Sequence, residues 1–501
     1  MKPHGKQIVA LSLWLGVFGT IQTGCTTPVD GTQTLDVGGP EDTLLIDATI
    51  DSYGVDQTDP DTSSTMPSDT VNPLEPDTNT PPVTPPVTPE QPKPTRYAAD
   101  RILSPLSNYV VNNLRAIHAS NDQWQTDVFM KVGASTTVSH SNLKCFDGPH
   151  VDLAGHTELQ DTLDFFLNGD AAGTSPFKRT SLAAKSGMSA NWPLQGSPSP
   201  LDAEIGEIAP SVALIHYGTN DMGQGSTYES AIWKFGDRML NLTDALIDQG
   251  IIPVIFALMP RGDSATADRW VDTYNLVNQG VAQARQVPWV NMHWATQNIP
   301  GFGLSSDGIH LNGYKQNGQS RPCVFTEEGL QYGYNIRNLT NLKLLDRLRS
   351  TVLLQEAAPD DAWPTDGDGS PEAPFVIDSL PFTDLRDTAV SPHSNLSQYT
   401  GCNAKQDESG GEYLYELVLD KPTRIRAMVF DRGAVDVDIH LLDESASETG
   451  CLQRAHQIVQ TTLQPGTYFF ALDTFVSGGQ PKAGEYLFAI LECHPKDSVC
   501  D

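Results

Sequence analysis

Four short apolar runs, separated by amphipathic stretches, occupy the middle of the chain, and each is typical of a buried β-strand. The runs are "TDVFMKVGAS" at 126–135, "SVALIHYGT" at 211–219, "GIIPVIFALMP" at 250–260 and "QVPWVNMH" at 286–293. Between the second and third runs, apolar residues recur at helical spacing and the stretch ends on a glycine, which predicts a helix. Alternating strands and helices predict a parallel α/β domain at 97–355, with helices on both faces of the sheet.

Beyond residue 372 the pattern becomes that of short alternating strands. The stretches 411–420, 423–431, 436–443, 466–475 and 484–493 are separated by turn residues, and no long helical pattern interrupts them. We therefore expect a small antiparallel β-sandwich at 373–501. The stretch "EAAPDDAWPTDGDGSPE" at 356–372 is predicted to be the linker between the two domains.

The N-terminus predicts export. Lys2 and Lys6 precede an apolar stretch from 8 to 21, which is shorter than the ~20 residues of a membrane-spanning helix and typical of a signal peptide at 1–24. Gly24-Cys25 resembles the cleavage site of bacterial lipoproteins, which implies a lipid anchor on Cys25. Gln22 departs from the aliphatic residue usual at that position, so a soluble exported protein is the alternative. The anchored protein would reside at the outer membrane or cell surface.

Residues 25–96 are rich in proline, threonine and aspartate, as in "DTNTPPVTPPVTPEQPKPT". Such a segment cannot bury a core and favours extended polyproline II, so it is predicted to be a disordered tether. Residues 26–95 hold thirteen acids and one lysine, a large part of the net charge of −31. This balance argues against a nucleic-acid partner, because neutralising phosphates requires clustered Lys and Arg.

Cysteine usage agrees with an oxidising compartment. Apart from Cys25, the chain holds an even number of cysteines, and none has zinc-like C-x-x-C spacing. They are Cys145, Cys323, Cys402, Cys451, Cys493 and Cys500. Fifteen pairings are possible, and the division into domains favours 145–323, 402–451 and 493–500.

Polar residues with catalytic potential follow the predicted strands. Ser135 lies in a small-residue turn after the first run, Asn220 lies in "YGTND" after the second, and "SSDGIHLN" places Asp307 three residues before His310. A serine hydroxyl is too weakly acidic to attack an ester unaided, so a histidine must take its proton. A carboxylate then fixes the histidine tautomer and stabilises the imidazolium. These residues predict a serine hydrolase.

The ordered set resembles the SGNH/GDSL hydrolase family, which has a flavodoxin-like fold. Its blocks match Gly133-Ala134-Ser135, an isolated Gly187, 218–221 and 307–310. The resemblance implies that Ser135 is the nucleophile, His310 the general base and Asp307 the residue that orients the base. It implies an oxyanion hole made by the N–H groups of Ser135 and Gly187 and the amide of Asn220. It implies neither a cofactor nor a metal.

The resemblance leaves three interpretations open. The first is an esterase that removes small acyl groups, such as acetyl, from carbohydrate; the second is a lipase or lysophospholipase acting on a lipid ester. The third is an inactive hydrolase-like binding or adhesion lipoprotein, because Ala134 stands where the family normally has aspartate. Covalent labelling by a fluorophosphonate would separate the enzymes from the inactive protein.

Two further sets of residues were weighed as metal ligands, and no metal is predicted at either. His140, Asp147, His150, Asp152 and His156 are interpreted as solvated loop residues, and Asp436 and Asp438 as part of a solvated strand face. The C-terminal stretches resemble the bacterial pre-peptidase C-terminal (PPC) domain, which implies an accessory, non-catalytic role.

Overall fold

The computed structural model describes residues 93–500. The predicted signal peptide at 1–24, Cys25 and the tether up to residue 92 lie outside the described residues. Thr95 and Arg96, at the predicted end of the tether, are buried: the Thr95 N–H donates to Gln286 at 2.8 Å, and Arg96 pairs with Asp378 at 2.6 Å. Among the described helices, none has the length and apolar character needed to cross a membrane.

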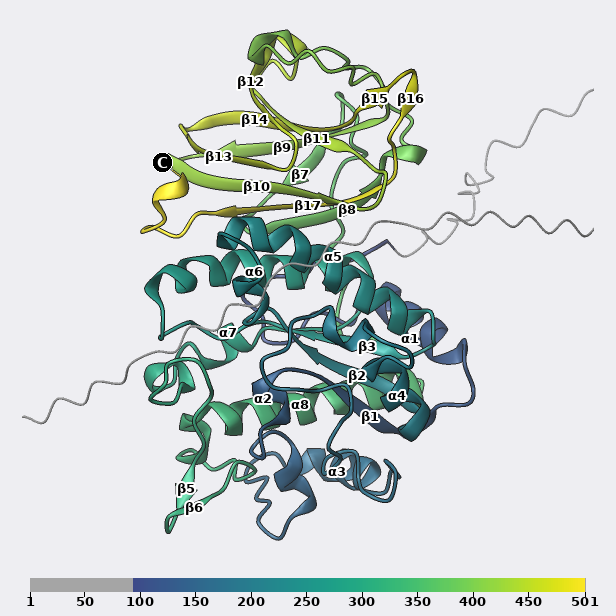
Figure 1. The fold of residues 1–501 in the computed structure, drawn as a ribbon, viewed down its shortest axis with the longest axis vertical. Helices are drawn as coiled ribbons and strands as arrows, with labels where there is room; N and C mark the ends of the chain where they lie inside the picture. Colours follow the sequence, from purple (N-terminus) through teal and green to yellow (C-terminus); the bar gives the residue numbers. More distant parts are fainter. Residues whose placement is uncertain (1–92, 501) are drawn as a thin grey trace, which may run out of the picture. The chain divides into compact units, whose positions relative to one another are not determined.

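A parallel sheet carries the α/β domain, and all four predicted strands are confirmed (Figure 1). The strands are β1 (Gln125–Gly133), β2 (Pro210–His216), β3 (Ile252–Phe256) and β4 (Trp289–Val290), in the order β1-β2-β3-β4. On the free side of β1, Ala184 forms a parallel bridge with Gly133. If the segment at Ala184 is counted as a reduced strand, it is the second along the chain, and β2, β3 and β4 become the third, fourth and fifth. The spatial order is then 2-1-3-4-5, as in a flavodoxin-like sheet, and the switch point lies beside β1.

The helices of this domain are α1 (Asn108–Ala119), α2 (Ser135–Val138), α3 (Gln160–Leu167), α4 (Pro200–Ile208), α5 (Tyr228–Ile247), α6 (Ala265–Ala284), α7 (Met292–Thr296) and α8 (Gly333–Leu348). The predicted helix between the second and third runs is α5. It begins at a capping box in which Thr227 and Ser230 each accept the other's backbone N–H at 3.0 Å. It is followed by Gly250 at φ +75°, a conformation that glycine adopts without strain.

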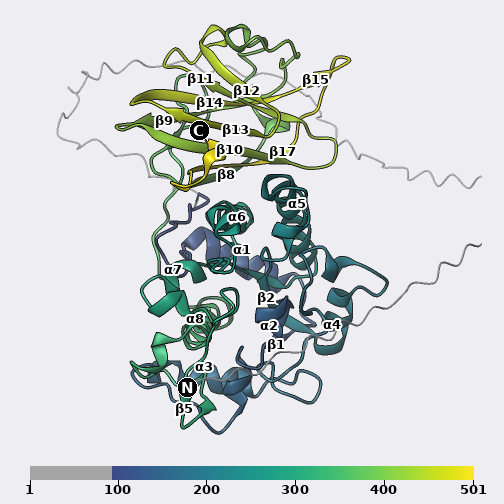
Figure 2. The same ribbon diagram turned by 60° about the vertical axis from the view of Figure 1, so that its left-hand side comes forward.

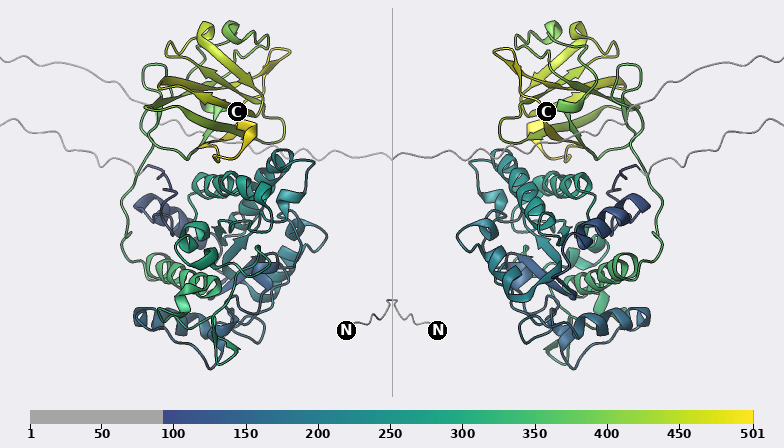
Figure 3. Two further views of the ribbon diagram at one scale, coloured as in Figure 1. Left: turned by 90° about the vertical axis from the view of Figure 1, so that its left-hand side faces the viewer. Right: turned by 90° about the vertical axis from the view of Figure 1, so that its right-hand side faces the viewer.

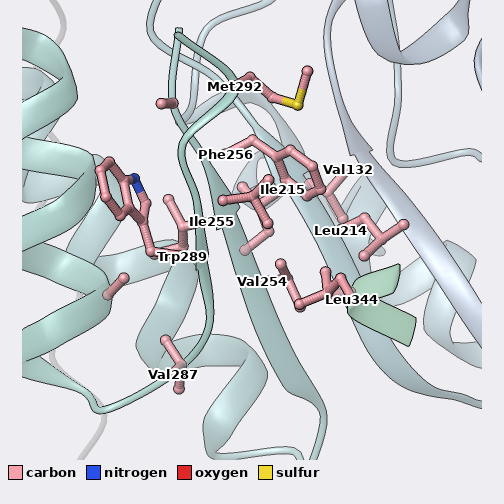
Figure 4. Packing of buried hydrophobic residues seen from close by; sticks show 14 of the residues in the cluster. Val132, Leu214, Ile215, Val254, Ile255, Phe256, Val287, Trp289, Met292 and Leu344 are labelled. Atoms are coloured by element: carbon pink, nitrogen blue, oxygen red, sulfur yellow. The ribbon is translucent and has the colours of Figure 1, made fainter. Parts of the chain in front are cut away.

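The apolar core is continuous across the sheet (Figure 4). Every residue of β2 and β3 is buried, as expected for parallel strands covered on both faces. Val132, Ile215 and Val254, from three neighbouring strands, belong to one cluster of buried side chains with Trp289 of β4 and Leu344 of α8. Burial of these strands fixes the positions at which their carboxyl ends emerge.

The C-terminal β-rich region contains two packed sheets, seen edge-on in Figure 2. Its main strands are β7 (Phe375–Ile377), β8 (Phe382–Asp387), β9 (Glu412–Leu419), β10 (Thr423–Asp431), β11 (Val437–Leu442), β12 (Cys451–Ala455), β13 (Ile458–Leu463), β14 (Gly466–Thr474) and β17 (Glu485–Glu492). The sheet orders are β13-β10-β17-β8 and β12-β11-β14-β9-β7. All these pairs are antiparallel except β7 with β9. The five predicted strands are β9, β10, β11, β14 and β17.

Short hairpins project from both parts of the chain. They are β5 (Lys315–Gln316) with β6 (Gln319–Ser320), and β15 (Val476–Ser477) with β16 (Gln480–Pro481). The three favoured disulfides, Cys145–Cys323, Cys402–Cys451 and Cys493–Cys500, are confirmed. Residues of the predicted linker contact the α/β domain, where Asp360 accepts the Leu106 N–H at 2.8 Å and pairs with Arg347.

The interpretation of Asp438 as part of a solvated strand face is wrong, because its side chain is fully buried. Asp438 lies on β11, which has β12 on one side and β14 on the other. Alternation of polar and apolar residues along a strand predicts a solvent-exposed face only when no other segment covers that face. Here Arg454 and His456 lie over the carboxylate and hydrogen-bond to it.

Helices α5 and α6 pack against the sheet β13-β10-β17-β8, as the two side views show (Figure 3). Arg426 on β10 is buried in this contact, with 1% of its side chain exposed. Its guanidinium lies 3.8 Å from the ring centre of Trp270, donates to Thr273 at 2.8 Å and pairs with Asp497 at 2.6 Å. The contact between the α/β domain and the C-terminal β region therefore includes a buried cation, Arg426, whose partners come from both regions.

Replacing Arg426 with alanine is expected to lower the free energy of unfolding by about 3–5 kcal/mol, because it removes a buried guanidinium together with its contacts to Trp270, Thr273 and Asp497. Urea denaturation of the purified protein measures this change. Lys421→Ala is the control: its side chain is 67% exposed and lies 4.0 Å from Glu492, so its loss should cost less than about 1 kcal/mol. Equal losses for the two variants would contradict a structural role for Arg426.

Candidate active site

The turn between β1 and α2 places Ser135 at the carboxyl end of the first strand. The peptide N–H groups of Thr137 and Val138 donate to the Ala134 carbonyl at 3.0 and 3.1 Å, and Ala134 itself offers no side-chain cap. A side chain at Gly133 would approach Thr137 Oγ1 to 2.2 Å and the His216 carbonyl to 2.8 Å. Only glycine allows this close approach, and the tight turn that follows presents the Ser135 hydroxyl at the sheet edge.

The structure brings Ser135, His310 and Asp307 together in one hydrogen-bonded chain. His310 Nε2 lies 2.8 Å from Ser135 Oγ, across 175 residues of sequence. His310 Nδ1 lies 2.8 Å from Asp307 Oδ2. Because a carboxylate only accepts, Nδ1 carries the imidazole proton, and Nε2 is then the acceptor for the serine hydroxyl. This is the tautomer that a general base requires.

The Asp307 carboxylate is held in its charged form by local donors. Its Oδ1 accepts the backbone N–H groups of His310 and Ile309, both at 3.0 Å, and the Ser305 hydroxyl at 2.7 Å. These bonds, with the His310 N–H contributing most, lower the pKa of Asp307 far below its usual range. Although half of this side chain is exposed, the carboxylate therefore stays ionised in neutral and mildly acidic solution.

Asn220 and Gly187 are, with Ser135, the residues of the predicted oxyanion hole. Asn220 Nδ2 donates to the Met188 carbonyl at 3.0 Å, which places its amide against the segment that contains Gly187. That segment is docked on β1, since the Lys185 N–H donates to the Gly133 carbonyl at 2.9 Å. Gly187 is exposed at φ +80°. In the described part of the chain, neither the Ser135 nor the Gly187 N–H donates a hydrogen bond to another residue.

Sequence reasoning gave no role to Asp221, which fastens the Gly187 segment. Its fully buried carboxylate accepts the Ala190 N–H at 3.0 and 3.2 Å and a proton of Arg238 at 3.3 Å. Burial raises the pKa of Asp221, and the Ala190 N–H and Arg238 oppose that rise. The one sequence signal for Asp221 is its position directly after Asn220, where an aspartate is also typical of a turn.

A second missed pair lies beneath the serine. His216, the last residue of β2, is buried, and its Nδ1 accepts a proton of Arg337 at 2.7 Å. Burial, together with the Arg337 charge, holds the pKa of His216 well below its usual range, so the ring is neutral with its proton on Nε2. Arg337 also donates to Asn142 at 3.0 Å. Sequence reasoning missed this pair because 121 residues separate its members.

A small hollow of about 330 Å³, counting the space open to solvent, lies beside the serine. It is lined by Ala134, Ser135, Thr136, residues 216–220, Ile309 and His310. Ile309 is the one aliphatic side chain larger than alanine among these residues. The hollow can therefore hold a small group at the reacting atom, between the Ser135 hydroxyl and Asn220.

The five candidate ligands between 140 and 156 do not form a metal-binding group. They are exposed or half-buried, as predicted, and Asp147 accepts the Ser175 hydroxyl at 2.7 Å. Within residues 93–500, one group of three side chains converges closely enough to hold a metal, namely Asp436, Asp438 and His456. It lies in the C-terminal β region and not beside Ser135.

No protein-family model and no curated protein matches the sequence. Several solved structures are similar in part. A GDSL-like lipase from Bacteroides thetaiotaomicron is 14% identical, with 48% of this chain and 98% of that chain covered and a TM-score of 0.27. A two-domain esterase active on acetylated mannans is 12% identical, with coverage of 81% and 93% and a TM-score of 0.27. A peptidoglycan O-acetylesterase is 10% identical, with coverage of 51% and 100% and a TM-score of 0.33. With TM-scores this far below 0.5, these similarities carry no argument about the reaction.

Proposed function

We propose that this chain is a serine esterase of the SGNH/GDSL type that removes small acyl groups, such as acetyl, from carbohydrate. The observation that carries the proposal is the continuous chain from Ser135 Oγ through His310 to Asp307, with both contacts of the imidazole at 2.8 Å. This arrangement supplies the nucleophile, the base and the orienting carboxylate that acyl transfer needs.

The proposed reaction proceeds through an acyl-enzyme. Ser135 Oγ attacks the ester carbonyl carbon while His310 Nε2 takes the hydroxyl proton. The resulting oxyanion accepts hydrogen bonds from the Ser135 and Gly187 N–H groups and from the second amide proton of Asn220. Collapse of the intermediate expels the alcohol, which takes the proton from His310. Water, deprotonated by the same histidine, then releases the acid and restores the Ser135 hydroxyl.

The lining of the hollow favours a small acyl group. With Thr219, Asn220 and His310 in its wall, it offers little apolar surface to a long chain. A lipase or lysophospholipase would gain most of its binding energy from an extended apolar channel beside the serine. The lipid-esterase alternative therefore has less support than the carbohydrate esterase.

The inactive-protein alternative rests on Ala134, and the turn geometry weighs against it. Aspartate at this position could cap α2, yet Ser135 lies within hydrogen-bonding distance of His310 without any side-chain cap. The bridge between Gly133 and Ala184 and the two N–H donors to the Ala134 carbonyl hold the turn instead. We therefore propose an active enzyme.

The proposed cellular setting follows from the N-terminal sequence. We propose that the chain is exported, lipidated on Cys25 and anchored to the outer membrane or cell surface, with residues 25–92 as a tether and the C-terminal region as a PPC-like accessory domain. Three disulfides among the described residues support an oxidising compartment. Metabolic labelling with a palmitate analogue tests the anchor, since Cys25→Ser should abolish incorporation.

Ester hydrolysis by the purified protein tests the proposed reaction. We expect p-nitrophenyl acetate to be cleaved with a higher kcat/KM than the butyrate and octanoate esters, and acetate to be released from acetylated polysaccharide. A preference for octanoate would favour the lipid esterase. Failure to cleave any ester, together with failure to react with a fluorophosphonate, would favour the inactive binding protein.

Asn220→Ala is expected to lower kcat by about 10²–10³-fold, with little change in KM, because it removes one donor to the oxyanion. Steady-state kinetics with p-nitrophenyl acetate measures the two parameters separately. The exposed Asn241 on α5 provides the matched control, and Asn241→Ala should leave kcat unchanged. A rise in KM alone would mean that Asn220 binds the ground state and has no special role in the transition state.

A further inference from the structure

Carboxylate and imidazole side chains from three separate segments converge at one end of the C-terminal β region. Asp436 and Asp438 lie at the start of β11, Glu408 precedes β9, and His456 lies in the turn between β12 and β13. His456 Nδ1 is 3.1 Å from Asp436 Oδ1 and 3.2 Å from Asp438 Oδ1. The ligand atoms of these three residues all lie within 4.8 Å of one another. We call Glu408, Asp436, Asp438 and His456 the β11 cluster.

Glu408 is the unusual member of the β11 cluster. Its side chain is fully buried, and neither carboxylate oxygen has a hydrogen-bond partner. The nearest cation is Arg454, whose Nη2 lies 3.8 Å from Glu408 Oε1 while it pairs closely with Asp438. A buried carboxylate without hydrogen bonds is costly, and a positively charged ligand beside Glu408 would offset that cost.

Acidic side chains outnumber cations around the β11 cluster. Glu408, Asp436 and Asp438 are three acidic side chains, and Arg454 is the arginine that pairs with Glu408 and Asp438. Asp473, which is also fully buried and lies close enough to interact with Glu408, receives hydrogen bonds only from neutral donors.

We propose that the β11 cluster binds one divalent cation of the oxygen-preferring class, with Ca²⁺ as the fitting ion. Glu408, Asp436 and Asp438 supply the carboxylate ligands. Ca²⁺ takes about six to eight oxygen ligands from carboxylates, carbonyls and water in flexible geometry, which suits carboxylates drawn from two separate segments. His456 stands at the exposed rim, where its Nδ1 hydrogen-bonds the Asp438 carboxylate and lies 3.1 Å from Asp436 Oδ1.

The site would hold the C-terminal region together and does not take part in the proposed ester hydrolysis. It joins the segment before β9 to the start of β11 and to the turn after β12. Ca²⁺ should therefore raise the thermal stability of the protein, and it should leave kcat for p-nitrophenyl acetate unchanged. A neutral, protonated Glu408 is the alternative, and it requires no ion.

Isothermal titration of the full chain, first dialysed against EDTA and then against metal-free buffer, tests the proposal. We expect one Ca²⁺ per chain and an unfolding midpoint several degrees higher in millimolar CaCl₂ than in EDTA. Glu408→Gln and Asp438→Asn should each weaken Ca²⁺ binding at least tenfold. Asp420→Asn, which changes an exposed acid in the same β region, should bind Ca²⁺ like the unaltered protein.

Glu408→Gln keeps the experiment decisive even if Asp438→Asn fails to fold. Because it removes a repulsive charge, it should be at least as stable as the unaltered protein in EDTA while losing the stabilisation by Ca²⁺. The absence of Ca²⁺ binding, or equal binding by Glu408→Gln, would overturn the proposal. Binding of Zn²⁺ in preference to Ca²⁺, with loss on His456→Ala, would overturn the assignment to an oxygen-preferring ion.

Discussion

Ser135→Ala is expected to reduce kcat for p-nitrophenyl acetate by about 10⁵-fold, to the rate that binding and the oxyanion donors alone can sustain. The hydroxyl is the only part of the residue that is removed. The Ser135 N–H remains in place, so KM should change little. Because the acyl-enzyme can no longer form, the variant should also lose the pre-steady-state burst of p-nitrophenol, which stopped-flow absorbance detects.

Ser139→Ala is the matched control for this experiment. Ser139 follows Ser135 by one helical turn, and its hydroxyl accepts the Ser141 N–H at 3.2 Å without contacting His310. The Ser139→Ala variant should retain activity and react with a fluorophosphonate, whereas the Ser135→Ala variant should not be labelled. If Ser135→Ala keeps more than a small fraction of the activity, or is still labelled, the nucleophile is another residue and the proposed mechanism is wrong.

Asp307→Asn is expected to lower kcat by about 10⁴-fold although it changes almost nothing in size. The Ile309, His310 and Ser305 donors all point at Oδ1, so the asparagine oxygen will occupy that position. The amide nitrogen then faces His310 Nδ1 and donates to it. His310 must respond by carrying its proton on Nε2, where it can no longer accept the proton of Ser135.

A pH profile distinguishes a wrong tautomer from simple misfolding. Asp307→Asn should keep the unfolding midpoint of the unaltered protein within a few degrees. Its activity should recover partly at high pH, where hydroxide deprotonates the serine without help. Ser305→Ala, which removes one donor but keeps the carboxylate, should lose less than about tenfold. A similar loss in both variants would mean that the donors to Asp307, and not its charge, limit the reaction.

The central strands of the α/β domain could be predicted because a strand that is buried on both faces is a continuous run of apolar residues in the sequence. Strands β1 and β2 appear as continuous apolar runs. Strands β11 and β14 appear as alternating polar and apolar residues, with turn residues on either side. The four edge strands, β12, β13, β7 and β8, were missed, because partial burial at the sheet edges leaves weak patterns. Helix α6 was also missed, since amides and other polar residues occupy part of its buried surface.

The candidate site could be predicted only where its members share a recognisable local motif. Ser135, Asn220 and the 307–310 turn each follow this rule, and the structure brings their side chains to the same edge of the sheet. Asp221, His216 and Arg337 form contacts between segments 31 to 121 residues apart, and no local pattern records such contacts. The same holds for Glu408, whose burial depends on strands that follow it in the sequence.

The disulfide Cys145–Cys323 makes the geometry of the site dependent on thiol redox state. Cys145 follows Ser135 by ten residues and Cys323 follows His310 by thirteen, so the bond connects the nucleophile segment to the base segment. Asn338 braces the same junction, donating to the carbonyls of Ser141 and Pro322 at 2.8 and 3.0 Å. We expect protein made in a reducing cytoplasm to lack this disulfide. We also expect dithiothreitol to slow ester hydrolysis before it unfolds the chain. The proposed esterase would thus reach its full activity only in an oxidising compartment.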